Sequence, residues 1–173
     1  MIIKFIFPLI INEFAWDGTG SLLLITTSEG SILVFDAIKL SKESIGKLEG
    51  HSGECFTIAF DPKNNFFATG GTNSIICIWD SKELICTKTF TEIESTIKQV
   101  SVSFDGQHIA AASEEDNLFI IDVENLSFLK INTNNYPQLK VSWNPKRNLL
   151  AYICEDESKK SDEDLNFHVA FFK

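Results

Sequence analysis

The sequence predicts an all-β fold built from about four similar units of antiparallel strands. Three observations support this prediction. Apolar and polar residues alternate over short segments, turn-forming residues separate those segments, and the whole pattern recurs at intervals of about 40 residues. A unit of that length with about four short strands is typical of one blade of a β-propeller. We therefore expect a propeller segment of about four blades, which is a partial or incomplete ring.

The repeat is clearest around four residues that we call anchors. They are Trp16, Phe60, Val102 and Trp143, and they lie 44, 42 and 41 residues apart. An apolar residue precedes each anchor by two positions, as in a strand with one buried face: Phe14, Ile58, Val100 and Val141. Another large apolar residue follows each anchor by seven positions, after a turn: Leu23, Phe67, Ile109 and Leu150. Each unit is therefore expected to contain a hairpin.

The four units are expected at approximately residues 5–45, 46–90, 91–133 and 134–173, within a single domain that spans residues 1–173. The β-branched and aromatic stretch MIIKFIFPLII, residues 1–11, is predicted to begin the first unit as a strand. A signal peptide is the alternative for this stretch, but no small-residue cleavage site follows it. The stretch is too short to span a membrane.

The fourth unit is predicted to carry an extra loop before its last strand, HVAFF. The insertion is EDESKKSDED, residues 155–164, which contains six acidic side chains, two basic side chains and no apolar one. A solvated loop is the expectation. Calcium binding by an EF-hand is the alternative, but that motif requires a glycine and the loop has none.

The charge balance argues against direct binding of nucleic acid. The chain has 24 acidic and 15 basic residues, which gives a formal net charge of -9, and Arg147 is its only arginine. Proteins that bind RNA or DNA use positive surfaces to neutralise phosphates, and this composition has the opposite sign. The densest basic spot is Lys146-Arg147, with Lys140 nearby, which we interpret as a possible partner contact.

The sequence carries no sign of catalysis or cofactor binding. The motifs GxSxG, GxGxxG, HExxH and the phosphate-binding loop are all absent, so we expect no enzyme, no catalytic residue, no cofactor and no metal site. The four cysteines form no CxxC pair and are expected to be reduced core thiols: Cys55, Cys77, Cys86 and Cys154. Reduced thiols are typical of an intracellular protein.

Two dipeptides in the second unit point to a family. Gly50-His51 opens this unit and Trp79-Asp80 closes it. Together with the period of the repeat, they resemble the WD40 repeat family. The resemblance implies that His51 has a structural role, in which it ties the blade together with a hydroxyl, a turn aspartate and the tryptophan.

The remaining positions of that tie depart from the family pattern. By resemblance, the hydroxyl position falls on Gly71, which has no hydroxyl, and the turn aspartate falls on Asn73, which is an amide. We therefore expect a weakened polar network. The third unit offers Ser113 and Asp116 in the corresponding stretch but lacks the histidine and the tryptophan. The structural residues expected from the signature are Gly50, His51, Asn73, Trp79 and Asp80.

Longer stretches resemble one family in particular. WNPKRNLLAYICEDE at Trp143, together with FDPKNNFFATG and SFDGQHIAAASEED, is similar to the C-terminal part of the THO complex subunit 3 family. This resemblance implies a non-catalytic scaffold subunit of the nuclear THO/TREX assembly, which acts in mRNA processing and export. Its partners would be other THO/TREX protein subunits, with RNA contacted at most indirectly, no membrane and no small-molecule substrate.

Two alternative functions remain open at this point. One is a propeller hydrolase, which would need a cluster of carboxylates or histidines around the central channel. The chain is also compatible with a generic WD-repeat adaptor of another complex, such as a ubiquitin ligase or a signalling scaffold.

The family's full chain is about twice as long as this one, and an open arc would leave sheet faces and strand edges exposed to water. We therefore expect the sequence to be a fragment or an incomplete gene model, with further blades encoded elsewhere.

Overall fold

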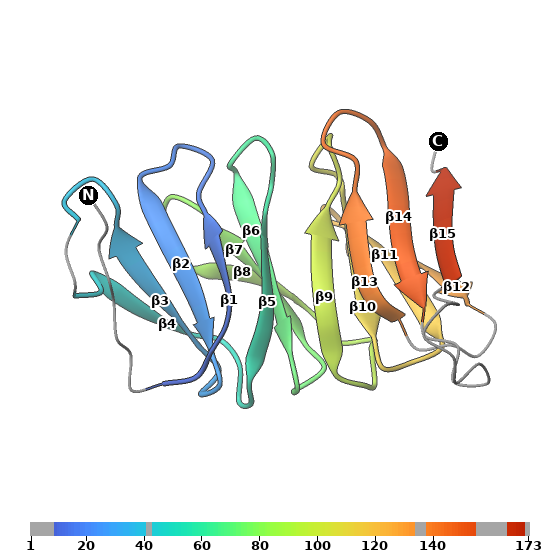
Figure 1. Cartoon of the computed structure of the whole chain (residues 1–173), viewed down its shortest axis with the longest axis horizontal. Helices are drawn as coiled ribbons and strands as arrows, with labels where there is room; N and C mark the ends of the chain where they lie inside the picture. Colours follow the sequence, from blue (N-terminus) through green and yellow to red (C-terminus); the bar gives the residue numbers. More distant parts are fainter. Residues whose placement is uncertain (1–8, 41–42, 134–137, 155–165, 172–173) are drawn as a thin grey trace.

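The computed structural model describes residues 9–40, 43–133, 138–154 and 166–171 (Figure 1). The first sheet contains β1 (Ile11–Trp16), β2 (Leu22–Thr27), β3 (Ser31–Asp36) and β4 (Gly46–Glu49). The second contains β5 (Cys55–Phe60), β6 (Phe66–Gly71), β7 (Ile76–Asp80) and β8 (Cys86–Phe90). The third contains β9 (Ile97–Val102), β10 (His108–Ser113), β11 (Asn117–Asp122) and β12 (Phe128–Asn132). The fourth contains β13 (Gln138–Trp143), β14 (Leu149–Cys154) and β15 (Asn166–Phe171).

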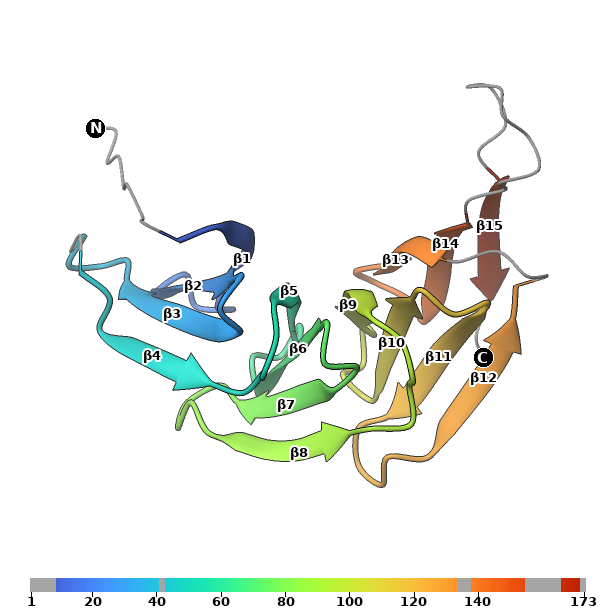
Figure 2. The same cartoon turned by 90° about the horizontal axis from the view of Figure 1, so that it is seen from below.

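Each sheet is an antiparallel meander in which strands pair in sequence order. Figure 2 shows the four sheets side by side in an arc, with β1, β5, β9 and β13 along its inner side and β4, β8 and β12 along its outer side. The arc is not closed into a ring. The prediction of an all-β, propeller-type fold with about four blades is confirmed, and we number the sheets blades 1 to 4. No helix in the described residues is long and apolar enough to cross a membrane.

The sheets and the predicted units differ in one boundary. The strand β4 lies at the start of the predicted second unit, yet it pairs with β3 and completes blade 1. Its pairing extends from Ser31↔Glu49 to Val34↔Gly46. The sequence repeat is therefore offset from the sheets, because the dipeptide Gly50-His51 follows the outermost strand of one blade and precedes the innermost strand of the next.

The hydrophobic core is divided into three clusters, one at each interface between neighbouring blades. Leu24 and Val34 of blade 1 pack with Ile58 and Phe67 of blade 2. The next cluster joins blades 2 and 3, and the last joins Ala110 and Ile120 of blade 3 to Val141 and Leu150 of blade 4. At the predicted repeat positions, Phe67, Ile109 and Leu150 are completely buried.

At the equivalent positions blade 1 is the exception, because no described blade packs against the face of blade 1 that points away from blade 2. Phe14 is 63% exposed and the anchor Trp16 is 54% exposed. The equivalent residues of blade 4, Val141 and Trp143, are 2% and 6% exposed. Burial at these positions therefore depends on whether a blade precedes them in the arc.

A recurring hydrogen bond links the innermost strands of neighbouring blades. The donor is the backbone N–H of the residue two positions before an anchor. The acceptor is the side chain of the residue three positions before the anchor of the preceding blade. Ile58 donates to Glu13 Oε2 at 2.8 Å, Val100 to Thr57 Oγ1 at 3.1 Å, and Val141 to Gln99 Oε1 at 3.0 Å. We call this contact the inner-strand bond. It satisfies an N–H on the strand edge that no ladder partner covers.

The inner-strand bond predicts the effect of replacing Thr57, which is 1% exposed. In Thr57→Val the shape is kept but the N–H of Val100 loses its acceptor, so the free energy of unfolding should fall by about 1–3 kcal/mol. Urea denaturation measures this change. Thr89→Val, at an exposed position on β8, is the control and should stay within about 0.5 kcal/mol of the wild type. Equal stability of all three proteins would contradict the prediction.

Candidate functional site

The signature residues of the second unit meet in blade 2 as a chain of hydrogen bonds. Trp79 Nε1 donates to Thr69 Oγ1 at 2.9 Å. Thr69 Oγ1 lies 2.8 Å from His51 Nε2, and His51 Nδ1 lies 2.9 Å from Asn73 Oδ1. An indole N–H only donates, so the Thr69 hydroxyl donates onward to Nε2 and Nδ1–H donates to Asn73. Every member of this chain is satisfied by one neutral tautomer of the histidine.

The hydroxyl in this chain comes from Thr69, which corrects the expectation that Gly71 occupies that position. Thr69 lies on β6 opposite Ile58 and Cys77, and it is completely buried. A Cβ at Gly71 would collide with the carbonyl oxygen of Glu54, so the backbone approaches too closely there for a side chain. The network is therefore complete, and the expectation of a weakened one was wrong with respect to the hydroxyl.

The other signature residues have packing and turn roles. A Cβ at Gly50 would overlap the six-membered ring of Trp79, so the glycine allows the indole to lie against the chain. Asp80 Oδ1 accepts the N–H groups of Lys82 and Glu83, both at 2.8 Å, which closes the β7–β8 turn. These two bonds lower the pKa of Asp80.

The same turn recurs at the equivalent aspartates of blades 1 and 3. Asp36 Oδ1 accepts the N–H groups of the residues two and three positions further along the chain, and Asp122 Oδ1 does the same. In the third unit, Ser113 Oγ accepts the N–H of Glu115, so this serine caps a turn and is not part of a histidine network.

Two thiols and the histidine of blade 2 are buried, and burial shifts their pKa values. Burial raises the pKa values of Cys55 and Cys77 to about 12, which keeps both as thiols. Burial also lowers the pKa of His51, although the bond to Asn73 opposes this shift. Cys86 differs from the expectation of a core thiol, because it lies exposed on β8. The side chain of Cys154 lies outside the described residues.

Charged side chains lie in the loops at both ends of the blades. Lys146 and Arg147 are exposed in the β13–β14 turn, where Asn144 Oδ1 accepts the N–H of Lys146 at 2.9 Å. The opposite end carries acidic side chains in the loops between strands, which we call the acidic end: Glu29, Glu54, Glu92, Glu94, Glu114 and Glu115.

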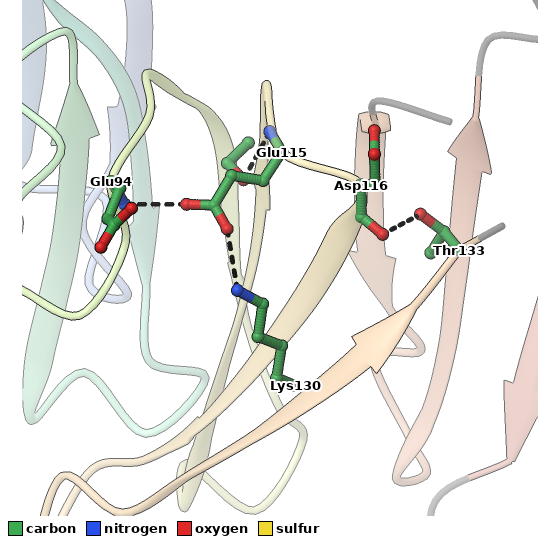
Figure 3. Close-up of polar contacts among 6 residues, drawn as sticks. Glu94, Glu115, Asp116, Lys130 and Thr133 are labelled. Carbon is green, nitrogen blue, oxygen red and sulfur yellow. Dashed lines mark hydrogen bonds and ion pairs between the residues drawn. The ribbon is translucent and has the colours of Figure 1, made fainter. Parts of the chain in front are cut away.

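Polar contacts within blade 3, and between blade 3 and the loop that leads into it, hold part of the acidic end in place. Figure 3 shows Glu115, which accepts the N–H of Glu94 at 2.8 Å and pairs with Lys130 Nζ at 3.1 Å. Beside it, Thr133 Oγ1 donates to the backbone carbonyl of Asp116 at 2.8 Å (Figure 3). A second ion pair, 2.6 Å long, joins Lys98 to Glu114. The lysines near this end are therefore engaged with its carboxylates.

The sequence analysis missed the acidic end as a surface. Its residues come from four separate loops, and only the strand pairing shows that these loops lie at one end. Within the described residues, no group of three or more His, Cys, Asp or Glu side chains is placed to hold a metal ion. The predicted loop 155–164 and the predicted strand within residues 1–11 fall wholly or largely outside the described residues.

The chain of hydrogen bonds in blade 2 predicts a strong effect of Thr69→Val. This change removes the acceptor of the Trp79 N–H and the donor to His51 Nε2 at a fully buried position, so the free energy of unfolding should fall by at least about 2 kcal/mol. Thermal and urea denaturation measure it, with Thr89→Val as the exposed control. A loss no larger than that of the control would contradict the network.

The lowered pKa of His51 predicts a pH dependence of stability. The folded protein binds the His51 proton less readily than the unfolded chain, whose histidine has its ordinary pKa of 6.5. The stabilising contribution is therefore full above that value and is lost as the pH falls through it. Between about pH 7.5 and pH 5.5, the wild type should lose more unfolding free energy than His51→Gln. Parallel pH profiles of the two proteins would contradict this assignment.

Comparison with known proteins adds family evidence to this geometry. The family model described as "WD domain, G-beta repeat" matches residues 42–80 and 84–122. Each match begins near the outermost strand of one blade and ends with the third strand of the next, which is the offset seen in the fold. The matched family is one of repeats and indicates no enzymatic activity.

Several characterised proteins are similar in sequence. THO complex subunit 3 of Arabidopsis thaliana is 33% identical over 154 residues, which cover 89% of this chain and 48% of that protein. Eukaryotic translation initiation factor 3 subunit I of Pyricularia oryzae is 27% identical over 86% of this chain and 40% of its own length. The WD repeat-containing protein AAC3 of Dictyostelium discoideum is 32% identical over 55% of this chain and 20% of its own length.

Solved structures support the same fold. The RRP9 WD40 repeats superpose with a TM-score of 0.77 at 14% identity, covering 85% of this chain and 46% of that one. The Cps50 (Swd1) β-propeller domain of Myceliophteria thermophila gives a TM-score of 0.73 at 20% identity, covering 84% and 50%. The chain thus spans about half the length, or less, of the proteins it matches. It is a WD40-repeat protein of the β-propeller fold whose sequence is similar to THO complex subunit 3.

Proposed function

We propose that the protein is a non-catalytic scaffold subunit of the THO/TREX assembly, located in the nucleus, where it acts in mRNA processing and export. The observation that carries this proposal is the similarity to THO complex subunit 3 over 89% of the chain. Of the three relatives compared above, this one combines the highest identity with the widest coverage of this chain. Its partners would be other protein subunits of that assembly.

The charge distribution supports contact with proteins rather than with RNA. The formal net charge is -9. At the acidic end, Lys98 and Lys130 are paired with glutamates, which offset their positive charge. Any RNA contact would therefore be made mainly by the partner subunits. The buried, neutral environment of His51 leaves it a structural residue, and we propose no cofactor and no small-molecule substrate.

We propose Lys146 and Arg147 as a partner contact, because both side chains are exposed on a turn at the rim of blade 4. Basic side chains on a rim steer an acidic partner surface and raise the rate of association. The acidic end lies at the other end of the blades, so this contact would be separate from it.

A generic adaptor of another complex is the second candidate. It is favoured by the similarity to a translation initiation factor subunit over 86% of the chain, because that protein belongs to a different assembly. The two candidates predict different partners and different locations. Recovery of the partners therefore separates them directly.

Affinity purification of the tagged protein from nuclear extract tests the proposal. With and without RNase, we expect THO subunits to be recovered, because the contacts are between proteins. Mass spectrometry identifies the partners. Recovery of subunits of another complex, or loss of the THO subunits after RNase, would refute the proposed function.

The partner contact is tested with the double variant Lys146→Glu and Arg147→Glu. Reversal of both charges should reduce recovery of the partner subunits most strongly at low salt, since attraction between exposed charges is screened by ions. The matched control is Lys39→Glu with Lys82→Glu, which reverses two exposed charges on blades 1 and 2. Equal recovery with both double variants would rule out a specific role for Lys146 and Arg147.

A further inference from the structure

Two cysteines of blade 2 lie on neighbouring strands. Cys77 is on β7, and Cys86 is on β8, the outermost strand of the blade. Cys86 is paired with Trp79 across the two strands, and directly opposite residues point to the same side of a sheet. Cys77 is two residues from Trp79 and packs in the same core between blades 1 and 2. Cys77 and Cys86 are therefore diagonal neighbours.

The thiol of Cys86 is turned along β8 toward Cys77. A β-bulge lies here, between the pairs Ile78↔Lys88 and Trp79↔Cys86. Cys86 Sγ lies 3.4 Å from the backbone oxygen of Lys88, at the level of the residue next to Cys77. Burial raises the pKa of Cys77 to about 12, and the charge interaction and side-chain hydrogen bond with Cys86 act in the same direction. The two thiols are thus in direct contact.

The thiols of this core differ in their access to water. Cys86 is exposed, whereas Cys77 is 2% exposed and donates to the carbonyl oxygen of Gly50 at 3.5 Å. Cys55 is completely buried, and its thiol donates to the backbone oxygen of Thr57 at 3.9 Å. An oxidant in solution therefore reaches Cys86 first and finds the thiol of Cys77 beside it.

The outer strand can adjust to a bond between the two sulfurs. A disulfide requires Cα atoms within about 7 Å of each other, and diagonal neighbours in a sheet lie about 7–8 Å apart. A small shift of β8 is therefore sufficient. In the described sheet β8 pairs only with β7, and three of its five residues are exposed, so this strand is the least constrained part of the blade.

We propose that Cys77 and Cys86 form a redox modification site, at which a peroxide converts the two thiols into a reversible disulfide. First, the sulfur of Cys86 attacks one oxygen of the peroxide. The O–O bond breaks, Cys86 becomes a sulfenic acid, and the other oxygen leaves as an alcohol or water with the thiol proton. The sulfur of Cys77 then attacks the sulfur of Cys86. The S–S bond forms, and the hydroxyl leaves as water with the Cys77 proton. The peroxide accepts both electrons.

The disulfide would also change a contact between blades 1 and 2. Cys77 loses its hydrogen when the bond forms, so the carbonyl oxygen of Gly50 loses its donor. Gly50 precedes His51 in the segment that joins the two blades. Oxidation at the exposed strand β8 is therefore transmitted to that segment. The proposal is independent of the complex to which the protein belongs.

Peptide mapping of the oxidised protein tests this site. Trypsin cleaves after lysine and arginine and places each cysteine on a separate peptide: residues 48–63, 64–82, 83–88 and 148–159. After treatment of the folded chain with hydrogen peroxide, we expect peptides 64–82 and 83–88 to be linked, and dithiothreitol should release them. Absence of this link, or linkage of either peptide to another cysteine peptide or to a second copy of itself, would overturn the proposal.

Two variants test the order of the steps. In Cys86→Ser, the buried thiol of Cys77 should stay unmodified by peroxide. In Cys77→Ser, whose hydroxyl can still donate to Gly50, oxidation of Cys86 should stop at the sulfenic acid and be trapped by dimedone, whereas the wild type should lose this label by forming the disulfide. Cys154→Ser keeps both thiols and is the matched control, which should still form the link. Circular dichroism checks that each variant is folded. Equal dimedone labelling of the wild type and folded Cys77→Ser would overturn the role of Cys77.

Discussion

The structure depends on one constraint: the sheets are apolar on the faces they turn to one another, so blades are stable only when stacked. Interior strands such as β7 and β11 are buried over nearly their whole length. Their side chains alternate between two cores, so that Ile78 packs toward blade 3 while Cys77 and Trp79 pack toward blade 1. Removing either neighbour would expose half of such a strand to water, which is why the unit of stability is the interface rather than the blade.

Polar groups at these interfaces fix how the blades stack. Hydrophobic contact is non-directional and would allow one blade to slide along another. The inner-strand bond sets a register, because one side chain must reach one N–H. The chain from Trp79 through Thr69 to His51 does the same within blade 2, where it connects the strands β6 and β7 to the segment that leads into β5. Gly50 belongs to this arrangement because the indole lies against it.

Much of the fold could be predicted from the sequence, because apolar periodicity reports which faces are buried. The anchors, the turns that follow them and the number of blades all rest on that signal. The identity of the hydroxyl in blade 2 could not be predicted in the same way. The repeat places Gly71 and Thr69 on the same face of one strand, and only the close approach of the Glu54 carbonyl shows which position can hold a side chain. The inner-strand bond and the acidic end were missed because both join residues from separate loops or blades.

The contrast between the two ends of the arc explains how a scaffold can be selective. A repeat tends to make all interfaces alike, and an open arc of identical blades would bind itself as readily as any partner. Phe14 and Trp16 offer an apolar face at one end, and Ala151 and Ile153 contribute apolar side chains at the opposite end. Apolar area alone does not distinguish partners, so the polar groups at an interface decide how well a partner fits. Lys140 stands at the position that carries an acceptor in blades 1 to 3, so the polar contact that sets the register of the other interfaces cannot be repeated with this side chain.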